Sequence, residues 1–399
     1  MKIPVRAIFS GWGAFLLLAI LLVLSVWMLV DGYRKGNQRL VVEIQEALGA
    51  TGLAHYVAQR YEERDPSTFR LLNRKPLINY CRSHPRTLTP QQEIEGVPLQ
   101  VFIDRYSEIW TLTQQPQARR AAIDIDLHPG TDHLLSMQSE FEGMNSLLIP
   151  IPTRNSPLSL QERVKWATRS LECIEGYLGG GFLLDEMTRM ALLVDWINKS
   201  RWLMSEIESA DQLRSMLAAL DSIEPPVTAI QRALEMEYIH SIEVLQAQGN
   251  SPQEGLAPFY RQPELHFGLT HLLGRITHID QPVESIDPPW YVKVMPDRGV
   301  LDSFSIRGPF GFPPYFWGEG VEFIQHAQML SQELAAGIDF FEKAVRHRIA
   351  RLEEGQEATL AEGLVVKAGR SGEILVIGSR LAEERSMLPD LFEPYRFPE

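Results

Sequence analysis

The chain has 399 residues, of which 45% are hydrophobic and 22% are charged, and its formal net charge at pH 7 is −13. This balance is typical of a globular protein and excludes a disordered or collagen-like one. The first 40 residues hold five basic and one acidic residue, so the rest of the chain carries 33 basic against 50 acidic residues. An acidic body repels nucleic-acid phosphates, and we therefore expect no nucleic-acid partner.

Residues 1–36 are predicted to form an N-terminal tail and a transmembrane signal anchor. No charged residue occurs from Ala7 to Val30, and a helix needs roughly 20 apolar residues to cross a bilayer. A cleaved signal peptide has a shorter apolar core, of about 7 to 15 residues, followed by a small-x-small site. The pattern therefore predicts a single-pass protein of the cell membrane, with an anchor that is not removed.

The charges that flank this span give little guidance on its orientation. The positive-inside rule counts lysines and arginines near the membrane, and here the two sides nearly balance, with Lys2 and Arg6 before the span and Arg34, Lys35 and Arg39 after it. We expect the N-terminus in the cytoplasm and the C-terminal body outside it, in the periplasm if the cell is Gram-negative, because that is the commoner arrangement for one N-terminal anchor.

The body is predicted to be mainly α-helical. Residues 37–64 are expected to form a juxtamembrane helix that ends at Asp65-Pro66, with Val41, Ile44, Leu48 and Tyr56 on one face. Residues 65–157 are rich in proline and are predicted to be a connecting region. Residues 158–280 are predicted to be a helical bundle that begins with the capping box Ser159-Leu-Gln-Glu162.

The last third of the chain contains three different patterns. Residues 281–318, rich in Pro, Gly and aromatic side chains, are predicted to form a loop, because prolines forbid a regular helix there. Residues 319–360 are predicted to be a long helix, since apolar residues recur at spacings of three and four. Residues 361–399 are predicted to hold a β-hairpin, from Leu364–Ala368 and Glu373–Gly378, and a Pro/aromatic tail. The expected fold is an anchored, irregular α-helical bundle with a small C-terminal β-hairpin.

One short loop has the residue types of a metal site. If residues 123–127 were extended, alternate side chains would point the same way, and the candidate ligands are Asp124, Asp126, His128, Asp132 and His133. Their spacing matches neither a zinc motif nor a calcium-binding EF-hand loop. The alternative is an exposed amphipathic strand followed by a Pro-Gly turn, in which Asp132 caps a helix.

The aromatic loop is the best candidate for recognition. Large rigid side chains at this density occur in interfaces and in ligand lids; they are Trp290, Tyr291, Phe310, Phe312, Tyr315, Phe316 and Trp317. The alternative is that the loop folds over the bundle and fills its core.

Three functions remain open from the sequence. The chain has no Gly-x-Ser-x-Gly elbow, phosphate loop or dinucleotide fingerprint. We therefore expect a non-enzymatic structural or interaction subunit of an envelope or membrane complex, with the membrane and a protein or second copy of the chain as partners, and no cofactor. The alternatives are a membrane-anchored metal-dependent hydrolase that uses residues 124–133 and a ligand-binding module closed by residues 288–317.

Overall fold

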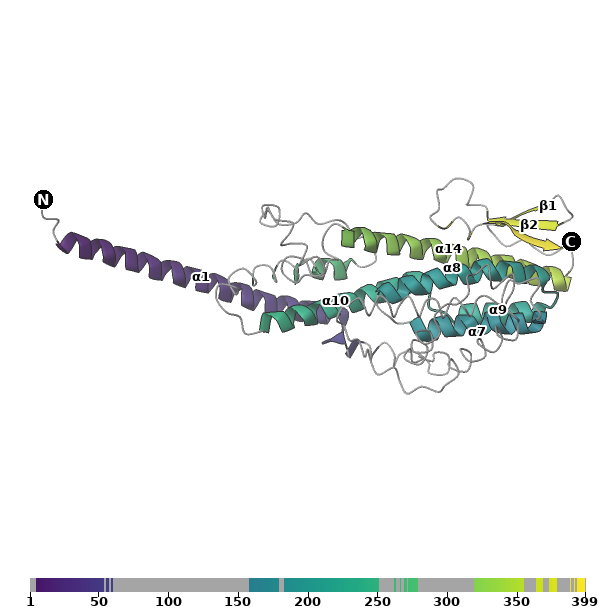
Figure 1. Ribbon diagram of the computed structural model, residues 1–399, viewed down its shortest axis with the longest axis horizontal. Helices are drawn as coiled ribbons and strands as arrows, with labels where there is room; N and C mark the ends of the chain where they lie inside the picture. Colours follow the sequence, from purple (N-terminus) through teal and green to yellow (C-terminus); the bar gives the residue numbers. More distant parts are fainter. Residues whose placement is uncertain are drawn as a thin grey trace, which may run out of the picture. The chain divides into compact units, whose positions relative to one another are not determined.

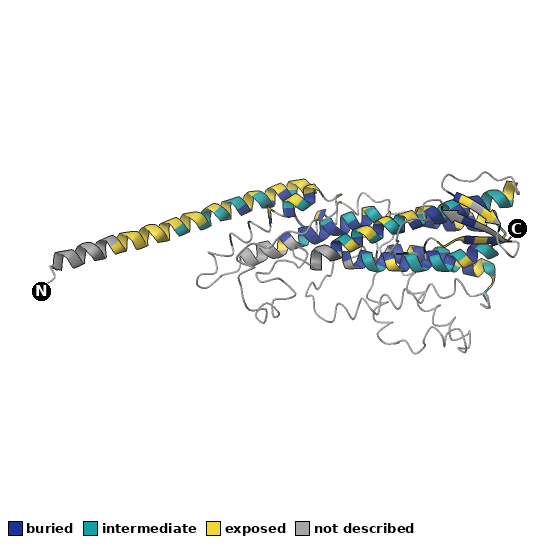
Figure 2. Ribbon diagram, turned by 90° about the horizontal axis from the view of Figure 1, so that it is seen from above, coloured by how far each residue is buried: buried dark blue, intermediate teal, exposed yellow. Residues whose placement is uncertain are grey.

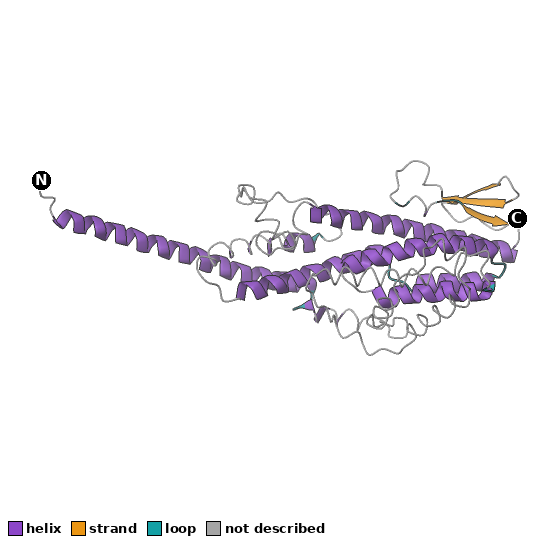
Figure 3. Ribbon diagram, in the orientation of Figure 1, coloured by secondary structure: helices purple, strands orange, loops and turns teal. Residues whose placement is uncertain are grey.

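The computed structural model confirms a mainly α-helical chain with one long apolar helix at its N-terminus (Figures 1 and 3). The structure describes residues 5–53, 55–56, 59, 158–178, 183–250, 262, 266, 269–270, 272–278, 319–354, 364–368, 373–378, 388, 391, 393 and 394–398. The chain divides into two compact units, each described below by itself. Unit 1 comprises Met1–Val57 and Leu234–Gln325, and unit 2 comprises Ala58–Ala233 and His326–Glu399.

In unit 1, helix α1 is continuous from Val5 to Leu48. The sequence patterns placed a boundary after residue 36, but no proline or helix-ending glycine motif occurs there, and the helix continues through it. Apart from Val42, its exposed large apolar residues lie between Phe15 and Leu29, and an inward-facing stripe begins at Asn37 and continues with Val41 and Ile44. One helix therefore changes from an apolar rod to an amphipathic core helix.

The end of α1 differs from the prediction, because the helix ends at Leu48 and not near Asp65-Pro66. Gly49 has a φ of 65°, a left-handed conformation that glycine adopts without the steric penalty of a side chain. The amide of Gly49 donates to the carbonyl of Glu46, and the amide of Ala50 donates to that of Gln45. This pair of bonds is a Schellman motif, which satisfies carbonyl groups at a helix end.

Unit 2 is built around an antiparallel helix pair, α7 (Leu160–Leu178) and α8 (Leu183–Glu206). The capping box of α7 is confirmed, since the amide of Ser159 donates to Glu162 at 2.7 Å and the amide of Glu162 donates to the Ser159 hydroxyl at 3.3 Å. Arg163, at the start of α7, pairs with Glu206 at the end of α8. The indole of Trp196 on α8 donates to the Ala167 carbonyl on α7 at 2.9 Å.

Two further helices follow. Helix α9 (Ala210–Asp221) packs against α7; its N-cap residue is Ser209, although the Ser209 side chain makes no capping bond. Helix α10 (Pro226–Asn250) begins at a proline, which suits a first helical position because that amide needs no partner. The part of α10 up to Ala233 belongs to unit 2, and the part from Leu234 belongs to unit 1.

Helix α14 (Glu319–Glu354) contributes its residues from His326 onwards to unit 2. Its predicted stripe faces inward, and Leu334, Phe341 and Val345 are fully buried. The Phe341 ring lies 5.4 Å from that of Trp196 on α8, measured between centroids. Aromatic pairs at this separation stabilise a core beyond their buried area.

The C-terminal sheet has three strands in the order β1-β2-β3 (Figure 3). The predicted hairpin is confirmed, with β1 (Leu364–Ala368) antiparallel to β2 (Glu373–Gly378) and Val366 opposite Val376. The third strand, β3 (Tyr395–Pro398), pairs antiparallel with β2 and comes from the segment that we expected to be only a tail. It also contacts α8, so the sheet is attached to the helices of unit 2.

Candidate functional site

Both sites predicted from the sequence lie outside the described residues. The Asp/His loop, with Asp124, Asp126, His128, Asp132 and His133, falls between residues 60 and 157, and the aromatic loop from Trp290 to Trp317 falls between residues 279 and 318. They stay predictions. Within the described ranges, no group of three or more His, Cys, Asp or Glu side chains is placed to hold a metal ion.

The exposed apolar part of α1 is the most distinctive surface of unit 1 (Figure 2). The helix holds a stretch, Phe15–Leu48, whose most apolar window has a mean hydropathy of 2.5 and no buried residue. Trp27 and Met28 are 61% and 68% exposed. In water such a surface is unfavourable by roughly 25 cal/mol per Å², so its length and composition are compatible with a single-pass membrane anchor.

The polar groups of this segment are satisfied inside the helix. Ser25 is the only polar side chain from Ala14 to Val30, and its hydroxyl donates to the Leu21 carbonyl at 2.8 Å. A bilayer interior offers no water to bond such a hydroxyl. The first carboxylate, Asp31, pairs with Lys35 at 2.7 Å, so charges begin where the apolar run ends.

A polar contact at Asn37, six residues after Asp31, fixes α1 to the rest of unit 1. Asn37 is 4% exposed, and its Nδ2 donates to both the backbone and side-chain oxygens of Gln262 at 3.0 Å. Its Oδ1 lies 3.0 Å from Nδ1 of His266, and the His266 ring stands edge-on to Tyr33. Because the Asn37 Oδ1 can only accept, His266 Nδ1 is the donor of this bond.

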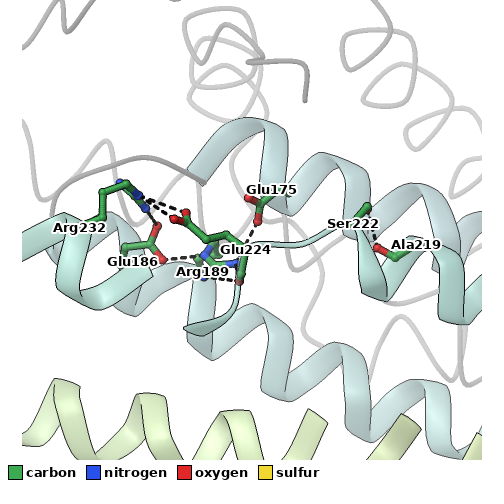
Figure 4. Close-up of polar contacts among 7 residues, drawn as sticks. All are labelled: Glu175, Glu186, Arg189, Ala219, Ser222, Glu224 and Arg232. Atoms are coloured by element: carbon green, nitrogen blue, oxygen red, sulfur yellow. Dashed lines mark hydrogen bonds and ion pairs between the residues drawn. The ribbon is translucent and has the colours of Figure 1, made fainter. Parts of the chain in front are cut away.

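In unit 2 the main polar feature is a buried ion cluster (Figure 4). We use this name for five side chains from α7, α8, α10 and the segment between α9 and α10: Glu175, Glu186, Arg189, Glu224 and Arg232. Arg189 and Glu186 are fully buried, and the other three side chains are 8–11% exposed. Charged side chains rarely lie inside a protein, because burial removes them from water. A buried charge therefore needs bonded partners that replace the water.

The ion cluster alternates in sign. Glu186 lies between the two arginines, accepting from Arg189 Nε at 2.6 Å and from Arg232 Nη2 at 2.7 Å. Arg189 Nη1 also donates to Glu175 at 2.9 Å, and Arg232 Nε donates to Glu224 at 3.1 Å. The nearby glutamates raise the pKa of Arg189 although burial opposes this. The guanidinium therefore stays charged in the core.

The ion cluster also fixes the turn between α9 and α10. Both terminal nitrogens of Arg189 donate to the Glu224 carbonyl at 3.3 Å, and the Ser222 hydroxyl caps α9 by donating to the Ala219 carbonyl at 2.7 Å (Figure 4). The five side chains are joined to one another by these bonds. The arrangement thus positions helices, and we assign it a structural role.

A second set of contacts seats the C-terminal strand. Tyr395 is fully buried, with the Phe340 ring 5.0 Å away and the Arg201 guanidinium 4.8 Å above its own ring. Burial raises the pKa of Tyr395 to about 12. Leu391 packs on Gly337 so closely that a Cβ at that glycine would lie 2.8 Å from Leu391 Cδ1. The absence of a side chain at residue 337 therefore makes room for the C-terminal segment.

His347 on α14 gives unit 2 a titratable core residue. It is 5% exposed, and burial, followed by the nearby Arg351 cation, lowers its pKa below 6.5. A histidine whose pKa is lower in the folded state contributes stability that is present above the unfolded pKa and lost as the pH falls. We therefore expect the urea midpoint of the full chain in detergent to fall between about pH 7 and about pH 5.5.

The comparison variant for this prediction is His347→Gln, in which the fall should be smaller. His278 is exposed, so His278→Gln serves as the control and should keep the pH dependence of the parent chain. Equal pH dependence in the parent chain and His347→Gln would exclude His347 as its source.

Comparison with protein-family models, curated proteins and solved structures gives no match for this chain.

Sequence reasoning missed the ion cluster and the residues that seat β3. One signal for the cluster is present in the sequence, because residues 182–207 have the pattern of a helix with apolar residues around much of its circumference. Glu186 and Arg189 interrupt that helix at a spacing of three, where side chains meet. A charge pair on a buried helix calls for further partners, but the sequence does not indicate which they are.

Proposed function

We propose that this chain is a single-pass, membrane-anchored protein that acts as a non-enzymatic structural or interaction subunit of an envelope or membrane complex. The observation that carries the proposal is the continuity of α1, from an exposed apolar segment to a stripe buried in unit 1. A helix of this kind connects a membrane span to a folded unit without a flexible joint. Such a connection suits a protein that holds a partner at a defined place on a membrane.

Features of unit 2 support the structural part of this proposal. The buried polar groups that we describe in Figure 4 bond to one another and connect helices. The acidic balance of the body, 33 basic against 50 acidic residues after residue 40, favours separation from an anionic lipid surface. We further propose that the body lies on the extracytoplasmic side, with the N-terminus in the cytoplasm.

Anchoring is tested by alkaline carbonate extraction of membranes that contain the chain. We expect the full chain to stay in the membrane pellet. Replacing Leu18 and Leu22 with arginine should release a large fraction of it, since each arginine near the centre of a span costs about 2.5–3.5 kcal/mol on the insertion scale. Replacing Val42 with arginine is the control, because Val42 is 50% exposed and lies beyond the apolar run. Release of the parent chain by carbonate would remove the basis of the proposal.

Orientation and partners need separate measurements. In a Cys81→Ser background, Asp211→Cys offers a thiol at a side chain that is 90% exposed, whereas Cys173 is buried. Labelling of intact cells by a membrane-impermeant maleimide is expected if unit 2 is extracytoplasmic. Cross-linking before detergent extraction should then yield a discrete higher-mass species. A chain that stays monomeric and retains no partner contradicts the subunit role.

A further inference from the structure

One face of α14 carries cationic and titratable groups that the described residues do not neutralise. We call this set the α14 basic site: His347, Arg348 and Arg351. Arg351 follows Arg348 by three residues and His347 by four, so its side chain neighbours both of them on the helix surface. Burial lowers the pKa of His347 and of Arg348, and the nearby Arg351 cation lowers both further.

Three buried polar atoms of the site have no hydrogen-bond partner among the residues that the structure describes. They are His347 Nδ1, Arg348 Nε and Arg351 Nη1. His347 and Arg348 are 5% and 6% exposed. Buried polar side-chain atoms nearly always have a partner, and a charged donor without an acceptor is especially unfavourable. Three such atoms on one helix face indicate that an acceptor belongs there.

The neighbouring groups supply only part of what Arg348 needs. Its Nη2 is 3.5 Å from the Ile207 carbonyl at the end of α8, which is long for a hydrogen bond. Its guanidinium lies 5.5 Å from the centre of the Phe397 ring on β3. Glu208 acts on Arg348 from a distance and is exposed. Burial and Arg351 outweigh it, and the pKa of Arg348 is lowered.

We propose that the α14 basic site binds one small inorganic anion, a phosphate-like oxyanion or a halide. Arg348 Nε and Arg351 Nη1 donate to it, and His347 adds a third donor when Nδ1 carries a proton. A small ion suits the site better than an acidic peptide or a lipid headgroup, because His347 and Arg348 are only 5% and 6% exposed and leave little surface for a larger partner. Binding places a negative charge between α14 and the α8–α9 junction and stabilises unit 2 by mass action.

The test is equilibrium dialysis of the full chain in detergent against radiolabelled inorganic phosphate. We expect saturable binding near one phosphate per chain. In Arg351→Gln the affinity should fall by about ten- to a hundredfold, as for the loss of one charge-assisted bond. Arg351 is suited to substitution because it is only half-buried. The variant Arg351→Lys, which keeps the charge but loses the fixed geometry of the guanidinium NH groups, should bind phosphate with intermediate affinity.

The matched control is Arg346→Gln on the same helix, where the arginine is 58% exposed and near Glu342 and Asp221; it should bind phosphate as the parent does. Competition with chloride identifies the class of ion. Displacement of phosphate by chloride at similar concentration indicates a halide-sized site, and resistance indicates an oxyanion site. The proposal is overturned if neither ion binds, or if Arg351→Gln binds phosphate as tightly as the parent chain.

Discussion

Replacing Glu186 with alanine is expected to lower the free energy of unfolding by about 3–5 kcal/mol. Glu186 accepts from both arginines of the ion cluster, Arg189 and Arg232. Its removal leaves two guanidiniums in the core with an incomplete set of partners, and an uncompensated buried charge costs more than the intact pair contributes. The measurement is urea unfolding of the full chain in detergent, followed by circular dichroism.

Two companion variants separate charge from packing. Glu186→Gln keeps the shape and one acceptor oxygen, so we expect a loss between those of the parent chain and Glu186→Ala. Arg214→Ala removes a surface pair, since Arg214 is 48% exposed and its partner Glu353 is 45% exposed, and such pairs contribute about 0–1 kcal/mol. If Glu186→Ala costs no more than Arg214→Ala, the ion cluster does not hold the helices of unit 2 together.

Replacing Phe341 with alanine is expected to destabilise the chain by about 3–5 kcal/mol, the usual cost of removing a buried phenyl ring. Phe341 is fully buried, and its ring lies 5.4 Å from Trp196 on α8 and 6.0 Å from Tyr395 on β3. The same urea titration measures the loss. Met329→Ala on the same helix is the control, because Met329 is 53% exposed and should change stability by less than about 0.5 kcal/mol.

A second readout tests the contact of Phe341 with the sheet. The ring packs on Tyr395, and Tyr395 belongs to β3. In Phe341→Ala, the amides of β3 should therefore exchange with deuterium earlier than those paired between β1 and β2. Equal acceleration throughout the sheet means that the lost stability is global and that Phe341 does not specifically hold β3.

Local signals account for the elements that the sequence predicted correctly. The capping box at Ser159 and the repeated apolar spacing of α14 involve only residues within one helix. The glycines at residues 369 and 372 indicate the turn of a single hairpin, whose two strands are neighbours in the sequence. The boundaries of α1 were less predictable. Gly49 ends the helix through two backbone bonds, although the apolar pattern continues to Tyr56.

Contacts between distant segments could not be predicted in the same way. Glu186 and Arg232 are separated by 46 residues, and the pairing of β3 with β2 brings Tyr395 opposite Val376. Each residue alone looks like an ordinary surface charge or a residue of a Pro/aromatic tail. Only the folded arrangement makes the arginine a core residue, and only that arrangement reveals the unbonded donors at Arg348 and Arg351.

Because α1 is one unbroken helix, the direction in which its apolar segment faces is linked to the direction in which its buried stripe faces. Residues 25 and 44 belong to one α-helix and lie about 28 Å apart along its axis at 1.5 Å per residue. Each residue adds about 100° of rotation, since a turn holds 3.6 residues. The side of the helix that faces a given lipid or neighbouring span therefore determines the side on which Asn37, Val41 and Ile44 meet unit 1. Rotation of this helix about its axis turns the buried stripe by the same angle, so a membrane that holds the apolar segment as proposed would set both the position and the direction in which unit 1 faces.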